Sequence, residues 1–271
     1  MVGVVFTMAE ILSPRPAATV MTLRDCDEGY EILMLRRNLN SDFVGGAYVF
    51  PGGGVDPADA GPPAQQLALG LNDVDASTRL ALESGGLAYY VACLRELFEE
   101  AGLLVACNTA GESVHFNDEA TIARMAAHRR DVNAGALGFI AMMRQEGLLL
   151  DLRGLEYVAH WVTPIGPPRR FDTRFFVALA PEGQTATHDA GETVADQWVR
   201  PKDALDAHAR GELDMIFPTI RNLEAIAEFS SSREVLDYAR SLTNIPRIEP
   251  RIVMREGNMS ILLSGDDGYE D

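Results

Sequence analysis

Three glutamates lie close together near the end of the segment Val91–Gly102. If this segment is helical, Glu96, Glu99 and Glu100 share an arc of about 100° of the helix surface. The opposite side of the same helix carries the apolar residues Leu94, Leu97, Phe98 and Ala101. Carboxylate oxygens gathered on one face are the ligands that Mg²⁺ prefers. The spacing therefore favours a metal site on a helix whose other face is core.

A solvated acidic surface is the simpler alternative for this glutamate cluster. Two costs argue against it. Glu96 stands three and four residues from Glu99 and Glu100, and like charges at these separations repel by a few tenths of a kcal/mol per pair. Glu99 and Glu100 also precede Gly102 by less than one turn, at the helix end where the dipole disfavours negative charge. A bound divalent cation would offset both costs.

A glycine-rich turn supplies the second part of the signal. The extended run Ala47–Phe50 leads directly into Pro51 and then Gly52, Gly53 and Gly54. Glycine lets backbone groups approach a metal ion or a phosphate closely. A structural turn is the commoner explanation of such a motif alone, but together with the acidic helix it favours a metal-binding site.

The stretch Arg95–Leu103 reads Arg-Glu-Leu-Phe-Glu-Glu-Ala-Gly-Leu. It resembles the second half of the Nudix hydrolase signature, Gly-x5-Glu-x7-Arg-Glu-U-x-Glu-Glu-x-Gly-U, in which U is aliphatic. The first half departs, because the signature places its glycine 14 positions before the arginine and Gly53 lies 42 positions before Arg95 (95 − 53). We therefore expect an insertion of 28 residues (42 − 14). Leu87 occupies the position of the first glutamate when counted back from Arg95, so that role is unfilled or passes to another residue such as Glu83.

Further segments extend the resemblance over most of residues 17–265. Tyr48–Gly53, the insertion, Trp161–Pro164 and Arg170–Phe176 are similar to a branch of the family that includes the peroxisomal coenzyme A diphosphatases. The resemblance implies a hydrolase that cleaves coenzyme A or acyl-coenzyme A into 3′,5′-ADP and a 4′-phosphopantetheine product. The alternatives are hydrolysis of NADH, ADP-ribose or a nucleotide sugar, and a catalytically silent nucleotide-sensing module on the same fold.

The resemblance also implies roles for the acidic helix. Glu99 and Glu100 are expected to bind Mg²⁺ or Mn²⁺, while Glu96 either binds the metal or takes a proton from the attacking water. Arg95 would orient the carboxylates through its planar guanidinium. The backbone carbonyl of Gly52 would supply another oxygen ligand. The metal would neutralise phosphate oxygens and activate water for in-line attack.

A later loop is expected to complete the metal site. The stretch His188–Glu192 precedes a predicted strand, and Glu192 is the favoured ligand. Asp189 and Asp196 remain alternatives to it. His160 and His188 have no partner at metal-ligand spacing, so we expect both to be structural or exposed.

Four arginines are candidate contacts for the substrate phosphates. Arg36 and Arg37 end a predicted strand beside the glycine turn, whereas Arg170 and Arg174 belong to a later strand region. Arginine binds phosphate oxygens through two parallel hydrogen bonds. A solvated strand-end position is the alternative for each of them.

The composition limits the partners of the chain. The 271 residues carry a formal net charge of −17, which argues against non-specific nucleic-acid binding. No apolar run approaches the roughly 20 residues that cross a bilayer, and the three cysteines show no zinc or disulfide pattern. The chain ends without the Ser-Lys-Leu peroxisomal signal. We therefore expect a cytoplasmic protein without nucleic-acid or membrane partners. The resemblance implies a small diphosphate substrate, and a homodimer is the preferred assembly.

The remaining pattern predicts how these residues are positioned. Strands and helices alternate irregularly, which is typical of an α/β (α+β) domain with a mixed sheet sandwiched between helices. The prediction is one Nudix-like domain over 1–271, with insertions at about 55–80 and 111–150 and a C-terminal extension from about 243. Residues 55–76 are expected to be irregular because they are rich in Pro, Ala, Gly and Asp. The predicted strands and helices follow in chain order: 17–24, 30–37, 47–50, 88–101 (helix), 120–128 (helix), 136–146 (helix), 156–162, 171–180, 194–199, 201–209 (helix), 217–230 (helix), 233–242 (helix), 251–254 and 259–263.

Overall fold

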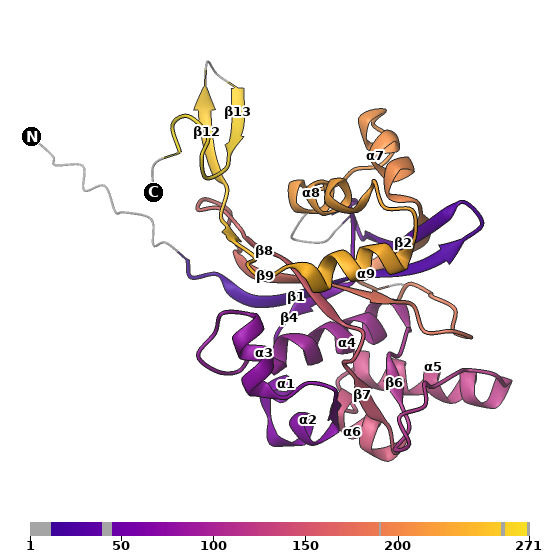
Figure 1. Ribbon diagram of the computed structural model, residues 1–271. Helices are drawn as coiled ribbons and strands as arrows, with labels where there is room; N and C mark the ends of the chain where they lie inside the picture. The colour runs from indigo at the N-terminus through magenta and orange to yellow at the C-terminus, as the bar shows by residue number, and fades with distance from the viewer. Residues whose placement is uncertain (1–11, 40–44, 190, 256–257, 270–271) are drawn as a thin grey trace, which may run out of the picture.

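A mixed eight-stranded sheet forms the centre of the molecule (Figure 1). The computed structural model describes residues 12–39, 45–189, 191–255 and 258–269. The strand order is β10-β2-β1-β9-β8-β11, with β3 paired to β2 and β4 paired to β1. The α/β class predicted from the sequence is confirmed. The strands of this sheet are β1 (Arg15–Cys26), β2 (Gly29–Arg37), β3 (Tyr48–Val49), β4 (Gly52–Gly54), β8 (Glu156–Val162), β9 (Phe171–Leu179), β10 (Thr193–Val199) and β11 (Arg247–Ile248).

Both faces of the sheet are covered, and the alternation of side chains in β2 shows this directly. Leu33 and Leu35 pack into one core cluster, and Ile32 and Met34 pack into the other. Successive side chains of a strand point to opposite faces. The centre of the strand, Ile32–Leu35, is therefore apolar on both sides, because each face meets a layer of helices.

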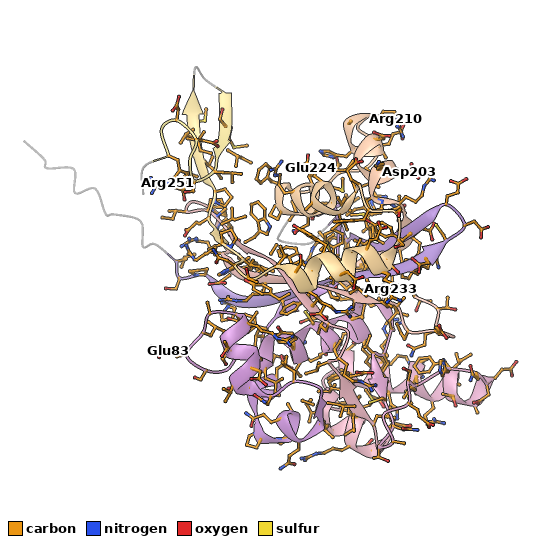
Figure 2. All side chains as sticks on the ribbon, viewed as in Figure 1. Glu83, Asp203, Arg210, Glu224, Arg233 and Arg251 are labelled. Atoms are coloured by element: carbon orange, nitrogen blue, oxygen red, sulfur yellow. The ribbon has the colours of Figure 1, made fainter. Side chains whose placement is uncertain are left out.

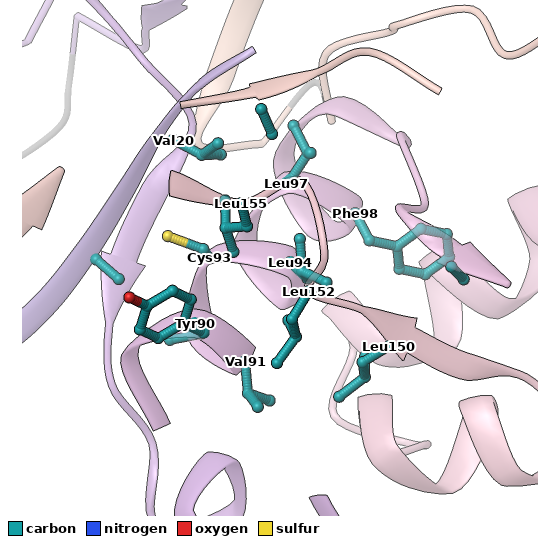
Figure 3. Packing of buried hydrophobic residues seen from close by; sticks show 14 of the residues in the cluster. Val20, Tyr90, Val91, Cys93, Leu94, Leu97, Phe98, Leu150, Leu152 and Leu155 are labelled. Atoms are coloured by element: carbon teal, nitrogen blue, oxygen red, sulfur yellow. The ribbon is translucent and has the colours of Figure 1, made fainter. Parts of the chain in front are cut away.

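The first layer is built on α4 (Leu87–Ala101), which packs against β1 and β4. Its apolar side chains meet Val20 of β1 and Leu150, Leu152 and Leu155 from a later segment (Figure 3). Gly102 ends the helix in the left-handed conformation, with φ of 70°. The other elements of this layer are α1 (Pro57–Ala60), α2 (Pro62–Leu67), α3 (Asp73–Arg79), α5 (Glu119–Asn133), α6 (Phe139–Gln145) and a small sheet of β5 (Ala68–Leu69), β6 (Ala106–Cys107) and β7 (Leu149–Asp151).

The second layer covers the opposite face with three helices of the C-terminal part: α7 (Pro201–Ala209), α8 (Phe217–Ile226) and α9 (Ser232–Ser241) (Figure 1). Leu223 and Val235 from this layer are fully buried against Met21 and Leu23 of β1. The C-terminal helices predicted from the sequence are confirmed. Together with this face of the sheet they form an apolar core.

The prediction that residues 55–76 are irregular is wrong, because α1, α2 and most of α3 lie in this range. Its turn-forming residues start short helices instead. Pro57 and Pro62 stand in the first turns of α1 and α2, and the side chain of Asn72 caps α3 by accepting from the amide of Asp75. Proline at a first helical position has no amide that needs a partner. The same residue types therefore fit helix starts as well as loops.

The C-terminal extension divides into two parts. Strand β11 joins the central sheet by pairing with β8, and β12 (Arg251–Arg255) and β13 (Asn258–Leu262) form a separate two-stranded hairpin that projects from the body (Figure 1). Among the residues that the structure describes, no helix has the length and apolar character to cross a bilayer.

Candidate active site

The glycine strand β4 lies directly against the acidic end of α4. The amide of Gly52 donates to Oε2 of Glu100 over 2.9 Å. A Cβ atom on Gly53 would lie 2.4 Å from Oε1 of Glu96, so any larger residue there would displace the Glu96 carboxylate. The structure thus brings together the two motifs that were 42 positions apart in the sequence (95 − 53).

Arg95 organises the carboxylates around it. Its Nη1 donates to Glu96 over 2.8 Å and to Glu99 over 3.2 Å, and its Nη2 donates to the carbonyl of Gly54 over 2.7 Å. The side chain is only 9% exposed. Although burial opposes the charge, the hydrogen bond from Arg95 to Asp59 and the charge of Glu96 raise the pKa of Arg95 above its usual value.

Asp59 is the residue of the site that sequence reasoning missed. It is 1% exposed and receives hydrogen bonds from Nε and Nη2 of Arg95 over 3.1 and 3.0 Å. Burial raises its pKa, and Arg95 pulls that pKa back down. Asp59 lies in α1, whose N-terminus is fixed because the same carboxylate accepts from the amide of Asp56 over 2.8 Å.

The spacing contains the signal that would have found Asp59. The signature puts its first acidic residue six positions after the glycine, and Asp59 stands six positions after Gly53 (59 − 53). The insertion therefore falls between Asp59 and Arg95, not before the first acidic residue. Leu87, which backward counting placed there, is a buried apolar residue at the start of α4. The alternative residue Glu83 is exposed in the loop between α3 and α4, on the outside of the molecule (Figure 2).

The three glutamates of α4 lie in surroundings that disfavour their ionised form. Burial raises the pKa of Glu96 to about 7, against an opposing effect of Arg95 and with a further increase from Glu99. Burial also raises the pKa of Glu100 well above its usual value, and the charge of Glu96 adds to that shift. The pKa of Glu99 is raised for the same first reason. A cluster of this kind gains stability from a bound cation.

The later loop brings Glu192 to this cluster. Its Oε1 accepts from Nη2 of Arg37 over 2.6 Å, and its charge contributes to the raised pKa values of Glu96 and Glu100. The competing carboxylates serve the loop itself. Asp189 accepts from the amides of Glu192 and Thr193, and Asp196 pairs with His188 over 2.7 Å.

The four arginines predicted to contact phosphate do not lie together in the structure. Arg37 points to the α4 side of the sheet, as do Leu33 and Leu35 of the same strand. Arg36 therefore points to the opposite side, where its guanidinium lies over the ring of Tyr48.

Arg170 and Arg174 are both buried and both bind other groups. Arg170 pairs with Glu249, and Arg174 pairs with Asp172 and lies over the ring of Tyr89 at the far end of α4. His160, predicted to be structural or exposed, also binds Asp172. Over the described part of the chain, neither arginine forms a hydrogen bond or ion pair with a glutamate of α4.

The donor set fits a hard divalent cation by its chemistry. Glu96, Glu99, Glu100 and Glu192 carry carboxylate oxygens, and the backbone of Gly52 lies against Glu100, with its amide 2.9 Å from Oε2. Within the described residues, no three Asp, Glu, His or Cys side chains already form a metal-holding group. Arg95 and the amide of Gly52 instead hold the glutamate oxygens. Binding a cation thus requires the carboxylates to exchange some of these contacts.

Comparisons with known proteins agree with this geometry. Residues 61–226 match the family model described as the NUDT19 Nudix domain. The chain is 28% identical to acyl-coenzyme A diphosphatase NUDT19 of Gallus gallus, over 92% of this chain and 75% of that protein. It is 27% identical to the Homo sapiens protein of the same name, over 89% and 73%. The crystal structure of a Nudix hydrolase from Alicyclobacillus acidocaldarius superposes with a TM-score of 0.69 and 28% identity, over 83% of this chain and 96% of that one.

Proposed function

Because the chain belongs to the NUDT19 Nudix domain family, we propose that it hydrolyses the diphosphate linkage of coenzyme A or acyl-coenzyme A with Mg²⁺ or Mn²⁺ bound. The observation that carries the proposal is the buried carboxylate cluster that Arg95 holds against the glycine strand. The names of the vertebrate relatives support the substrate class. The family membership agrees with the resemblance found in the sequence.

We propose a role for each residue of the cluster. Glu99 and Glu100 hold the metal with Glu192 and the Gly52 carbonyl, and Glu96 is a further ligand or accepts the proton of the attacking water. The bound metal would neutralise phosphate oxygens and lower the pKa of that water. Glu96 suits proton transfer because burial raises its pKa to about 7.

Two residues position the carboxylates rather than react. Arg95 orients Glu96 and Glu99 by donating a hydrogen bond to each carboxylate, and Asp59 holds Arg95 in place by accepting a hydrogen bond from its Nε. Of the four candidate arginines, Arg37 is the one we assign to a substrate phosphate, since it lies beside Glu192 on the α4 side of the sheet. Arg36, Arg170 and Arg174 are held elsewhere.

A substrate panel tests this proposal. Coenzyme A, an acyl-coenzyme A, NADH, ADP-ribose and a nucleotide sugar would be incubated separately with Mg²⁺ or Mn²⁺, and the products identified by mass spectrometry. We expect coenzyme A and water to give 3′,5′-ADP and 4′-phosphopantetheine, and the Glu100→Gln variant to form these products roughly 10³-fold more slowly. Turnover of another diphosphate with coenzyme A untouched would contradict the substrate class alone. If none of these compounds is hydrolysed, the enzyme hypothesis is contradicted and the nucleotide-sensing alternative takes its place.

We also propose that two copies associate through the hairpin β12–β13. Four large apolar side chains form two cross-strand pairs on one face of it, and all four are exposed: Ile252 with Ile261 and Met254 with Met259. A two-stranded hairpin is at best marginally stable alone in water.

A second copy is the partner that the chain itself supports. A hollow of about 210 Å³ near the base of the hairpin is lined by Trp161, Ile248 and Leu263, and Nε1 of Trp161 has no partner among the described residues. Projection and hollow on one chain allow reciprocal burial about a twofold axis. β13 also carries no charged residue, which limits repulsion between copies of charge −17.

Light scattering at micromolar concentration tests the assembly. We expect a dimer for the wild type and a monomer for Met254→Asp, with kcat unchanged. Val74→Asp is the matched control, because Val74 is equally exposed but distant in the fold. A monomeric wild type would contradict the proposal.

All three cysteines are free thiols, in keeping with our proposal of a cytoplasmic location.

A further inference from the structure

We propose that Arg129, from the inserted helix α5, is a positioning residue that locks the C-terminal end of α4 to the loop carrying Glu192. The proposal rests on the metal role proposed above for Glu99, Glu100 and Glu192. It would make assembly of the metal site depend on α5, a helix that follows the signature motif in the chain.

Arg129 makes two hydrogen bonds that join three segments of the chain. Its Nε donates to the backbone carbonyl of Glu99 over 2.9 Å, and its Nη1 donates to Oγ1 of Thr187 over 3.0 Å. The amide of Thr187 in turn donates to the carbonyl of Ala101 over 2.9 Å. The last four carbonyls of a helix receive no hydrogen bond from an amide of the same helix. Here α5 and the later loop provide their partners.

The close packing at Gly102 supports a specific contact. A Cβ atom on this residue would lie 2.9 Å from Nη1 of Arg129 and 3.5 Å from Oγ1 of Thr187. Gly102 also has a positive φ of 70°. Glycine at this position therefore serves both to end α4 and to admit the guanidinium of Arg129.

The charge of Arg129 is placed where α4 needs it. Burial lowers the pKa of Arg129, and the carboxylates of Asp189, Glu100 and Asp196 act against that effect. A cation at a helix C-terminus also opposes the negative end of the dipole, where Glu99 and Glu100 add further negative charge. Nη2 of Arg129 is buried and has no partner among the described residues.

The contact reaches Glu192 through the loop. Thr187 lies two residues before Asp189, whose carboxylate accepts from the amide of Glu192 over 3.0 Å. Moving Thr187 would therefore move the turn that presents Glu192. Groups that orient metal ligands in this way contribute strongly to metal affinity without touching the metal.

Two variants and one control test the proposal. Arg129→Met removes both donors, and Thr187→Val removes only the loop contact, so it remains informative if the first variant fails to fold. Asn133→Ala is the control, since Asn133 Nδ2 also donates to the Glu99 carbonyl, over 3.1 Å, without contacting Thr187. Mn²⁺ affinity is measured by calorimetry, and hydrogen exchange of residues 186–193 is followed in the metal-free protein.

We expect Arg129→Met to weaken Mn²⁺ binding by roughly tenfold or more, the range found for groups that orient metal ligands. Thr187→Val should weaken it less, and both should speed exchange in the loop, whereas Asn133→Ala changes neither. Wild-type affinity and exchange in folded Arg129→Met, or in Thr187→Val, would overturn the proposal. A wild type that binds no Mn²⁺ would contradict the proposed function instead, and the exchange data would still decide whether Arg129 couples the two segments.

Discussion

The two helical layers that cover the sheet differ in the kind of polar group they bury. The α4 layer buries ionisable side chains, whereas the layer of α7, α8 and α9 buries only neutral polar groups. The buried polar side chains of the helices are Asp59, Arg95, Glu100 and the neutral Ser77 in the first layer, and Thr219, Asn222 and Ser232 in the second. Burying a charge is costly unless it is paired. The difference teaches that the second layer is built for stability, and that the first gives up stability for a charged site.

The sharpest test of this comparison is Glu100→Gln. If Glu100 is a metal ligand, as we propose, its loss should lower kcat by roughly 10³-fold, because several kcal/mol of metal-supplied stabilisation are lost. The melting temperature of the metal-free protein should stay the same or rise, since burial raises the pKa of Glu100 well above its usual value and a neutral amide avoids that penalty. Steady-state kinetics and thermal unfolding measure the two effects.

Leu223→Ala is the opposite control in the second layer. Leu223 is fully buried, so the substitution should lower the free energy of unfolding by about 2–5 kcal/mol and leave kcat of the folded protein unchanged. If Glu100→Gln keeps its activity, or if folded Leu223→Ala loses it, the proposed division between the layers does not hold.

Asp59→Asn tests the support beneath the glutamates. Asp59 pairs with Arg95 over 3.0 Å, and both are buried. The change leaves the guanidinium without its main counter-charge, which should reduce both stability and kcat, the latter by about 10- to 100-fold. Glu83→Gln is the matched control, because Glu83 is exposed. Equal kinetics for the two variants would restore the view that the first acidic position is unfilled.

The strongly patterned elements were predictable from the sequence. The strand 156–162 and the helix 201–209 have the predicted bounds, and α4 begins one residue earlier than predicted. These segments are set by local apolar pattern and by Pro201 at a first helical position. The three glutamates were found for the same reason, since they follow the period of one helix.

The parts that depend on distant contacts were not predictable in the same way. Asp59 appears in the sequence as one aspartate in a segment of turn-forming residues. Its place six positions after Gly53 marks it as a candidate, but its role follows from the ion pair with Arg95 across 36 positions (95 − 59). Arg36 and Arg37 seemed equivalent until the sheet placed them on opposite faces. The small sheet of β5, β6 and β7 was missed, because strands of two or three residues carry too little pattern.

Metal binding should show a pH dependence that the second layer cannot produce. Burial raises the pKa of Glu96 from 4.5 to about 7 in the folded protein. The folded state thus binds this proton more tightly than the unfolded state, so the metal-free protein loses stability as the pH rises from about 4.5 to 7. Under the proposed function, Mg²⁺ would bind the ionised carboxylates and offset this loss of stability. We expect Mg²⁺ to raise the melting temperature by several degrees more at pH 8 than at pH 5.5.

Glu96→Gln should reduce that difference between the two pH values, because the titrating group is gone. Scanning calorimetry with and without Mg²⁺ measures it. An equal gain from Mg²⁺ at both pH values would show that the charge of the α4 layer does not limit the stability of the metal-free protein.

The smallest expected effect separates two adjacent arginines of one strand. Arg37 lies on the α4 side and binds Glu192, and Arg36 lies on the other side over Tyr48. If the α4 side alone meets the substrate, Arg37→Gln should raise KM about fivefold, the loss of roughly 1 kcal/mol for a charged contact. Arg36→Gln should change KM by less than about twofold, since exposed charges contribute little. The two variants remove the same charge from opposite faces of β2. Equal KM values would therefore mean that the substrate contacts both faces at this end of the strand. The face with the buried ionisable groups would then not be the only substrate face.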